Sequence, residues 1–193
     1  MTHSMKFCTS CASPLNIELP QGDSRARHVC SECGEIHYQN PKIVTGCIPE
    51  WEDRILLCRR AIQPRHGFWT LPAGFMENGE SAQQGAARET MEEANAKVRI
   101  VQLYATFNLP HIDQVYMLFR GQLLDTGFSP GEESLETCLY RESEIPWDEL
   151  AFAVVRETLV HYFSDRKQGA FVPRVGDIHR SPGAERGYQV TML

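Results

Sequence analysis

The sequence lacks any long apolar segment. No run approaches the roughly 18 apolar residues that a membrane helix needs, so we expect no membrane-spanning segment. The first residues, Met1 to Lys6, contain no apolar core of a secretory signal, and a cytoplasmic location is therefore expected. Basic residues are in the minority, 19 against 25 acidic ones, and the net charge of -6 excludes a protein whose whole surface binds nucleic acid.

Glycine and proline, 14 and 11 of 193 residues, are too few for a collagen-like or low-complexity chain. The hydrophobic fraction of 42% and the charged fraction of 23% are those of a soluble globular protein. The length allows one domain of ordinary size and a small extra module. We expect a module over residues 1–40, a main domain over 41–165 and an Arg-, Gly- and Pro-rich tail over 166–193.

Four of the seven cysteines form two Cys-x-x-Cys pairs. Cys8 and Cys11 make the first pair, Cys30 and Cys33 the second, and 18 residues separate the two. This spacing is typical of a structural zinc site, because four thiolates complete a tetrahedral shell. Two disulfides are the alternative, which a reducing cytoplasm disfavours. The spacing therefore predicts a zinc ribbon, in which the metal supplies the folding free energy of a module too small for its own core.

Two helices and four strands are predicted in the main domain. Ser81 and Gln84 form a capping box at the start of a helix that runs to about Ala96. Apolar residues at helical spacing predict a second helix from Pro146 to about Phe163. The predicted strands are Ile43–Ile48, Arg54–Arg59, Lys97–Leu109 and Gln114–Leu123. Strands interrupted by two separate helices indicate an α/β domain with a mixed sheet.

Three carboxylates lie on one face of the first predicted helix. Glu89, Glu92 and Glu93 stand at positions i, i+3 and i+4. Like charges at this spacing repel one another, so we infer that a cation fills the site. Oxygen ligands favour a hard divalent cation, Mg²⁺ or Mn²⁺, although an acidic helix face by itself is more often merely solvated.

The surrounding residues resemble the Nudix box, G-x5-E-x7-R-E-U-x-E-E-x-G-U, in which U is a bulky aliphatic residue. Six fixed positions are present in register, namely Gly74, Glu80, Arg88, Glu89, Glu92 and Glu93. Thr90 replaces an aliphatic residue and is expected to pack on the underside of the helix. Asn95 replaces a glycine and is expected to cap the helix in the left-handed conformation.

The resemblance implies a Nudix-type α/β/α sandwich with a mixed sheet, preceded by the zinc ribbon. It also implies a pyrophosphohydrolase that uses Mg²⁺ or Mn²⁺. By this resemblance Glu92 and Glu93 are the principal metal ligands, Glu89 is a ligand or the base, and the Gly74 carbonyl supplies one more oxygen.

Other site residues follow from the same resemblance and from strand geometry. Arg88 and Glu80 are expected to support the box carboxylates without touching substrate. Outside the box, Glu133 is the first choice for a further metal ligand or base, and Glu136 the second.

The arginines Arg59 and Arg60 end a strand near the box and are candidates for holding a diphosphate. Because strand side chains alternate, one of the two should point away, and Arg60 is preferred. The candidates for the rim of the substrate site are His66, Phe107, His111 and Gln114.

A zinc ribbon ahead of a Nudix domain is similar to the group that contains NADH pyrophosphatases. The S-Q-P-W-P-F-P segment of that group is absent, since residues 103–112 read LYATFNLPHI. The segments YQNPK at 38–42, WTLPAG at 69–74 and PGEESLE at 130–136 look more like FAD and ADP-ribose pyrophosphatases of bacteria and chloroplasts. We therefore expect release of AMP from FAD or ADP-ribose, with NADH and nucleoside triphosphates as alternatives. Many such relatives are homodimers, so a homodimer is expected.

The alternative class is a zinc-ribbon module that binds nucleic acid or protein. The predicted ribbon has Lys6, Arg25 and Arg27 against four acidic residues, Glu18, Asp23, Glu32 and Glu35. It lacks the basic excess that phosphate binding needs. We therefore expect a small-molecule nucleotide as the partner, and neither nucleic acid nor a membrane.

Overall fold

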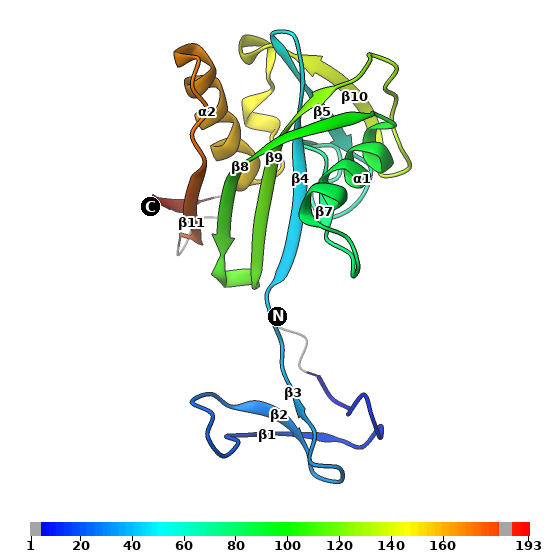
Figure 1. Ribbon diagram of the computed structural model, residues 1–193, viewed down its shortest axis with the longest axis vertical. Helices are drawn as coiled ribbons and strands as arrows, with labels where there is room; N and C mark the ends of the chain where they lie inside the picture. The colour runs from blue at the N-terminus through cyan, green and yellow to red at the C-terminus, as the bar shows by residue number, and fades with distance from the viewer. Residues whose placement is uncertain (1–4, 182–186) are drawn as a thin grey trace. The chain divides into compact units, whose positions relative to one another are not determined.

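The structure, a computed structural model, describes residues 5–181 and 187–193. The chain forms two compact units, Met1–Pro41 and Lys42–Leu193 (Figure 1). The boundary between the units was expected after residue 40, and the structure places it one residue later, after Pro41. Residues 1–4 and 182–186, which belong to the predicted module and tail, lie outside the described residues. Within the described chain, no helix combines the length and apolarity that crossing a membrane requires.

The first unit is a small antiparallel sheet with two cysteine turns. Its strands β1 (Leu15–Glu18), β2 (Arg27–Cys30) and β3 (Ile36–His37) pair in that order. Each turn has a left-handed residue directly after its second cysteine, Ala12 at φ 60° and Gly34 at φ 74°. This reversal of the backbone brings the two thiols of each pair to the same side of the turn.

The second unit is built on a nine-stranded mixed sheet. Its elements are β4 (Lys42–Trp51), β5 (Arg54–Arg60), β6 (Trp69–Thr70), β7 (Ala73–Phe75), α1 (Ala82–Ala94), β8 (Val98–Leu109), β9 (Gln114–Leu123), β10 (Ser134–Tyr140), α2 (Ala153–Gln168), β11 (Arg174–Arg180) and β12 (Tyr188–Met192). The sheet order is β10-β5-β4-β9-β8-β11-β12, with β6 paired to β5 and β7 to β4. The pairs β4–β9 and β8–β11 are parallel, so the sheet is mixed as predicted.

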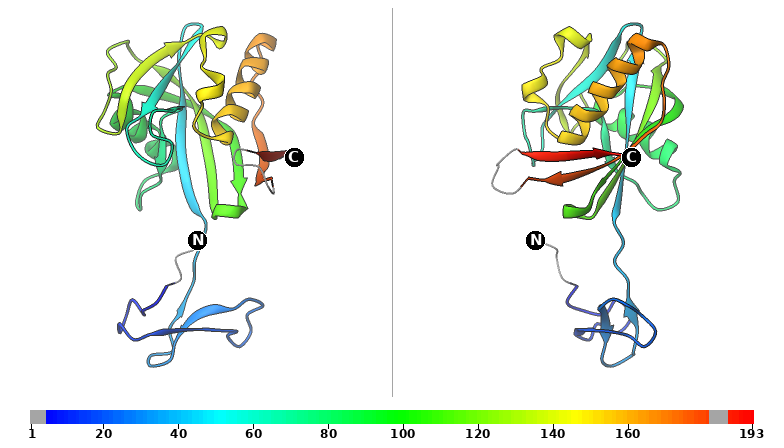
Figure 2. Two further views of the ribbon diagram at one scale, coloured as in Figure 1. Left: turned by 180° about the vertical axis from the view of Figure 1, so that it is seen from behind. Right: turned by 90° about the vertical axis from the view of Figure 1, so that its left-hand side faces the viewer.

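Strand β5 is buried on both faces. Ile55 and Leu57 belong to the core cluster that includes α2, whereas Leu56 and Cys58 belong to a second cluster with Ala94 at the end of α1. Because side chains alternate along a strand, the two helices cover opposite faces of the sheet. Figures 1 and 2 show α1 and α2 on the two sides, which confirms the predicted α/β/α sandwich.

The second helix begins later than predicted. The segment after Pro146 forms a 3-10 turn, Trp147–Glu149, and the helix starts only at Ala153. Ala151 N donates a hydrogen bond to Trp69 O, which joins this segment to β6. The apolar residues that suggested one longer helix therefore belong partly to the segment before Ala153 and partly to α2.

Residues 166–193 do not form the separate tail that the sequence suggests. The end of α2 takes up residues to Gln168, and β11 and β12 extend the sheet beyond β8. The close fit requires Gly176, since a Cβ there would lie 2.9 Å from Met192 Sδ and 3.1 Å from the Phe107 ring. Composition alone hid these strands because Arg, Gly and Pro are common in the segment.

A buried carboxylate fixes the end of α2 to the strands that follow. Asp165 is 2% exposed, accepts a hydrogen bond from Tyr104 Oη at 2.9 Å, and pairs with Arg174. Burial by itself raises the pKa of Asp165, but the hydrogen bonds from Arg174 and Tyr104 outweigh it and hold that pKa below its ordinary value. The ionised form is therefore the one that stabilises the fold.

We expect Asp165→Asn to lower the free energy of unfolding of the second unit by about 2–3 kcal/mol at pH 7. A lowered pKa gives stability that is present above the unfolded pKa and lost as pH falls through the folded pKa. The difference between wild type and variant should therefore shrink below about pH 4. Urea unfolding at pH 7 and pH 3 measures it, and a difference that is the same at both values would contradict this account.

Candidate active site and zinc centre

Helix α1, which carries the predicted carboxylates, is capped at both ends. Ser81 Oγ accepts a hydrogen bond from Gln84 N, and the Gln84 side chain accepts one from Ser81 N, which is the predicted capping box. At the other end Asn95 has φ 48°, as predicted, and its amide donates to the carbonyls of Ser129 and Pro130. Both ends of the helix are therefore held, and one of them also anchors a distant loop.

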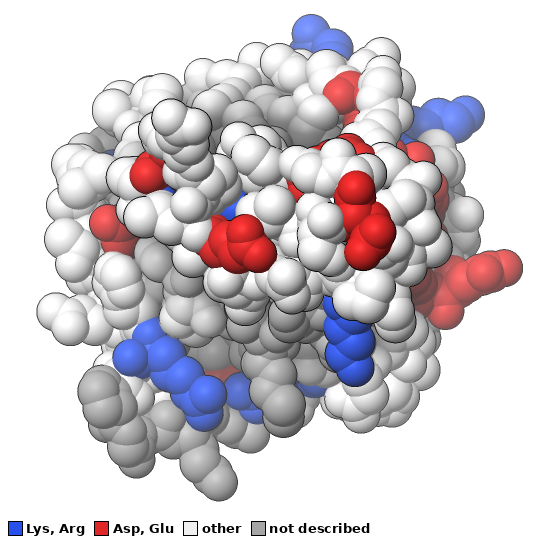
Figure 3. Space-filling model, turned by 90° about the horizontal axis from the view of Figure 1, so that it is seen from below, with Lys and Arg blue, Asp and Glu red and all other residues white. Residues whose placement is uncertain are grey.

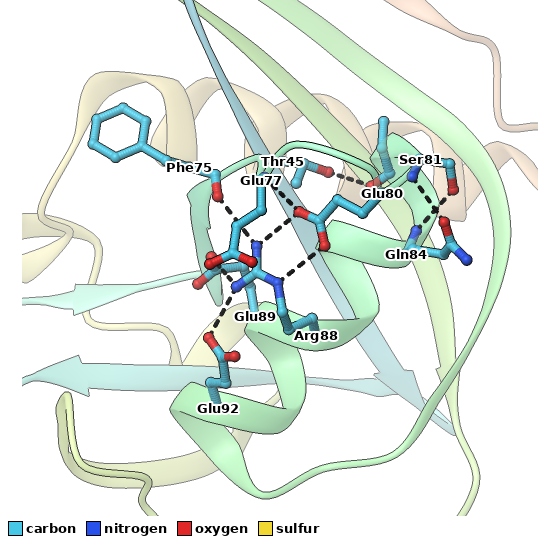
Figure 4. Close-up of polar contacts among 10 residues, drawn as sticks. Thr45, Phe75, Glu77, Glu80, Ser81, Gln84, Arg88, Glu89 and Glu92 are labelled. Carbon is cyan, nitrogen blue, oxygen red and sulfur yellow. Dashed lines mark hydrogen bonds and ion pairs between the residues drawn. The ribbon is translucent and has the colours of Figure 1, made fainter.

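Arg88 holds three box glutamates together (Figure 4). Its Nε and Nη2 donate to Glu80 at 3.0 and 2.9 Å, and its Nη1 donates to Glu89 at 2.7 Å and to Glu92 at 2.9 Å. Nη2 also donates to Phe75 O at 3.1 Å. The hydrogen bonds from Arg88 lower the pKa of Glu80 to about 2. The guanidinium thus sets the spacing of the carboxylates and offsets their repulsion.

Glu93 is buried without a full set of partners. Its side chain is 5% exposed, and its Oε2 is a buried atom for which the described residues supply no hydrogen bond. Burial is the largest cause of a pKa raised to about 8, and the charges of Glu89 and Glu133 act in the same direction against that of Arg60. Burying such a group costs free energy unless a cation or donor satisfies it.

Gly74 of β7 lies directly against Glu89. A Cβ at this position would come within 2.4 Å of the Glu89 carboxyl group, so a larger residue would displace that carboxyl group. Glu89 is 9% exposed, and its pKa is raised by burial first and by Glu92 and Glu133 after it, against the effect of Arg88. Oxygen donors of this kind are the ligands that a hard divalent cation prefers. Among the described residues, however, the carboxylate oxygens of Glu89, Glu92 and Glu93 do not all lie within 4.8 Å of one another, and Glu89 and Glu92 are bonded to Arg88 instead.

A loop far along the chain brings Glu133 to this cluster. Gly131 N donates to Glu93 O at 3.0 Å, and a Cβ at Gly131 would clash with Glu92 O, so the loop packs tightly on the end of α1. Glu133 O accepts a hydrogen bond from Ala61 N at 2.8 Å, which ties the same loop to the end of β5. Glu136 instead pairs with Arg59 at 3.6 Å.

The carboxylates line one cavity of about 1250 Å³. Among the predicted substrate residues, Arg60, His111 and Gln114 also line it. Arg60 is 9% exposed, its guanidinium lies 5.1 Å from the Phe152 ring, and its Nε donates to Pro64 O. The cavity therefore has arginine close to Glu93, as phosphate binding needs.

Three candidates lie elsewhere. Arg59 bonds to Gly67 O and to Glu136 on the other side of β5. His66 is exposed and is not among the residues that line the cavity, and Phe107 is fully buried in the core. Strand alternation explains both results, because it separates Arg59 from Arg60 and turns Phe107 inward.

Several cavity residues carried no signal in the sequence. They are Glu77, Arg65, Tyr116, Trp147, Phe152, Arg156, Arg180 and Tyr188. They come from loops, β9, the lead into α2, α2 itself and the two last strands, which only the fold brings together. The aromatic residues before α2 could have been noticed as a group, but their spacing indicates core as readily as a site.

The four predicted zinc ligands converge in the first unit. The thiol sulfurs of Cys8, Cys11, Cys30 and Cys33 lie within 4.8 Å of one another, with contacts of 3.4 to 3.6 Å. Zinc–sulfur bonds of about 2.3 Å give a tetrahedron with edges of about 3.8 Å, whereas a disulfide needs about 2.05 Å. The geometry fits zinc, and all seven cysteines are free thiols. His37 Nε2 lies 3.3 Å from Cys8 Sγ beside this group.

Two family models match the chain. The zinc-ribbon model described as Nudix N-terminal covers residues 6–39, and the NUDIX domain model covers residues 40–127. A crystal structure of a NUDIX hydrolase from Nitrosomonas europaea is 55% identical, with a TM-score of 0.89 over 91% of this chain and 100% of that chain. The fold and these matches thus define a protein of the Nudix type. The chain belongs to the Nudix hydrolase family.

Relatives with named activities are more distant. The NAD-capped RNA hydrolase NudC of Salmonella heidelberg (strain SL476) is 34% identical over 148 residues, which are 74% of this chain and 54% of that protein. The chain therefore spans about half the length of the curated relatives it matches. An ADP-ribose pyrophosphatase from Streptococcus suis 89-1591 is 22% identical, with a TM-score of 0.55 over 70% of this chain and 99% of that one. This last likeness shows the fold alone.

Proposed function

We propose that the chain hydrolyses the pyrophosphate bond of a nucleoside diphosphate linked to another group, with FAD or ADP-ribose as substrate and AMP as a product. The observation that carries the proposal is the buried Glu93, which lines a large cavity and whose Oε2 has no protein partner among the described residues. An orphaned carboxylate beside Glu89 and Arg60 supports a site built for a cation and phosphate oxygens.

The chemistry of the donor atoms fits a divalent cation. Glu89, Glu92, Glu93 and the Gly74 carbonyl would hold Mg²⁺ or Mn²⁺, since all their donor atoms are oxygens. Bound there, the ion would supply Lewis-acid stabilisation of phosphate charge and lower the pKa of a water. In the first unit the four cysteine thiolates would hold a structural Zn²⁺.

The protein groups would divide the remaining work. Arg60 would bind the diphosphate and offset its charge. Glu133, an exposed carboxylate on the cavity wall, would accept a proton from the attacking water. The water oxygen then forms a bond to one phosphorus, the bridging P–O bond breaks, and the second phosphate leaves with the electron pair. Arg88 and Glu80 act only as positioning residues.

The size of the cavity favours a dinucleotide-like substrate. Its volume of about 1250 Å³ exceeds the roughly 300–1,000 Å³ of common small-molecule pockets. NADH and NAD-capped RNA are the second candidates, because the NudC relative at 34% identity is an NAD-capped RNA hydrolase. Figure 3 shows acidic as well as basic side chains at the surface, and the net charge of -6 disfavours long RNA contacts.

The test is a substrate panel. FAD, ADP-ribose, NADH, NAD-capped RNA and dGTP are incubated with the pure protein and Mg²⁺ or Mn²⁺, and the products are separated. We expect AMP from FAD or ADP-ribose with a higher kcat/KM than from NADH, and no turnover when the divalent metal is omitted. Preference for NADH or capped RNA would move the proposal to the second candidates. Salt-dependent RNA binding without hydrolysis would favour the binding module instead.

We also propose a homodimer, by resemblance to relatives in the family. Light scattering at micromolar concentration tests it. A mass near 21.9 kDa, that of one chain, would contradict it.

A further inference from the structure

The last two strands supply part of the cavity wall. Arg180 of β11 and Tyr188 of β12 are directly paired across the hairpin, and both line the cavity that holds the carboxylates. Ile178, two residues before Arg180, is buried in the core and also lines it. Because side chains two apart on a strand share a face, Arg180 points to the same side as Ile178.

The hairpin formed by β11 and β12 contacts helix α2 at this wall. Tyr188 Oη donates to Glu157 Oε1 at 3.3 Å, one residue after Arg156 on α2. The Arg156 guanidinium lies 6.0 Å from the Trp147 ring. Burial is the largest cause of the raised pKa of Tyr188, and Arg156 acts against it by lowering that pKa. Arg156 therefore sits between a tryptophan from the lead into α2 and a tyrosine from the hairpin.

Phe152 completes a group that we call the aromatic lobe, composed of Trp147, Phe152, Arg156, Arg180 and Tyr188. Asp148, an exposed residue, lines the cavity nearby. Neither Arg156 nor Arg180 forms an ion pair with an acidic residue that the structure describes, although Arg156 lies against the Tyr188 hydroxyl. The Phe152 ring is faced by the Arg60 guanidinium at 5.1 Å. Aromatic rings and guanidinium groups without an acidic partner together suit a planar ring that carries phosphate, because rings stack on both and Arg binds phosphate oxygens.

We propose that the aromatic lobe is a nucleotide-binding subsite in which a planar base stacks and which the C-terminal hairpin completes. This inference rests on the proposed function, since it assigns the lobe to one nucleotide half of the same substrate. It makes Tyr188 and Arg180 specificity-determining residues, although neither lies in the Nudix box.

The test measures binding rather than turnover. AMP, FMN and ribose 5-phosphate are titrated by calorimetry into the full chain without added divalent metal. AMP and FMN carry a base and a phosphate, and ribose 5-phosphate carries a phosphate without a base. We expect AMP or FMN to bind more tightly than ribose 5-phosphate, and Tyr188→Ala to weaken that binding about 10-fold, as loss of one stacking partner does.

Three variants make the result decisive. Tyr188→Phe keeps the ring and loses only the bond to Glu157, so its affinity for the base-containing probe should stay within about two-fold of wild type. Arg180→Ala changes an exposed side chain and should weaken AMP or FMN several-fold without affecting the fold. Arg99→Ala is the matched control, because Arg99 is exposed on β8 and bonded to Gln122, outside the cavity.

Equal binding of AMP, FMN and ribose 5-phosphate, no binding of any of them, or unchanged affinity in both Tyr188→Ala and Arg180→Ala would overturn the subsite. Weakened binding in these variants beside an inactive substrate panel would instead leave the subsite in place and remove the proposed reaction. If Tyr188→Ala fails to fold, Arg180→Ala and Tyr188→Phe still decide the question.

Discussion

Glu93→Gln is expected to reduce kcat for FAD or ADP-ribose by about 10³-fold or more while leaving the fold intact. Glutamine has the shape of glutamate, so the packing around a side chain that is 5% exposed is kept. The substitution removes the negative charge that would bind the divalent cation. Initial rates at saturating substrate, with circular dichroism of the same preparation, measure both parts of the prediction.

The matched control is Glu136→Gln. It removes the same charge from an exposed residue that pairs with Arg59 away from the cavity, so its kcat should stay within about two-fold of wild type. Turnover by Glu93→Gln close to that of Glu136→Gln would show that Glu93 is not a metal ligand. A large loss in both variants would point to net charge rather than to the site.

Cys30→Ser is expected to abolish zinc binding and unfold the first unit. Among the described residues of that unit, the buried apolar side chains are those of Cys8 and Cys30 themselves, so the metal site takes the place of a core. Zinc content should fall from about one ion per chain to none, because binding and folding of so small a module are one event. Residues 5–41 should then become sensitive to protease.

Metal analysis and limited proteolysis check this result, with Cys138→Ser as the matched control. Cys138 is a half-buried thiol in β10 of the second unit, so the Cys138→Ser variant should keep the zinc content of the wild type. The second unit has its own core around α2 and should keep its melting temperature in Cys30→Ser. Zinc retained at one ion per chain in Cys30→Ser would contradict the four-thiolate site.

The parts of the site that are close in sequence were predictable. Helix α1, its capping box and the left-handed Asn95 depend on contacts within a few residues, and the helix period alone puts the carboxylates on one face. Thr90 packs beneath the helix as predicted, fully buried with its hydroxyl bonded to Ala86 O at 2.7 Å. Turn geometry likewise fixes each Cys-x-x-Cys pair.

Contacts between distant segments explain the errors. The last 28 residues looked like a tail because the local sequence of Arg174–Arg180 gives no sign of strand pairing. This segment forms a strand because it pairs in parallel with the edge of β8. The start of α2 was placed too early because apolar spacing is the same in a helix and in a turn packed on β6.

The sequence by itself determined the family, the convergence of the four cysteines and the placement of the glutamates on one helix, because these depend on short spacings that the backbone converts directly into geometry. Only the tertiary structure decided which arginine faces the cavity, how Glu133 reaches the cluster and where the aromatic lobe lies. Those features join β5, the loop before β10, α2 and the C-terminal hairpin. Their positions follow from sheet order and packing, which no single stretch of sequence specifies.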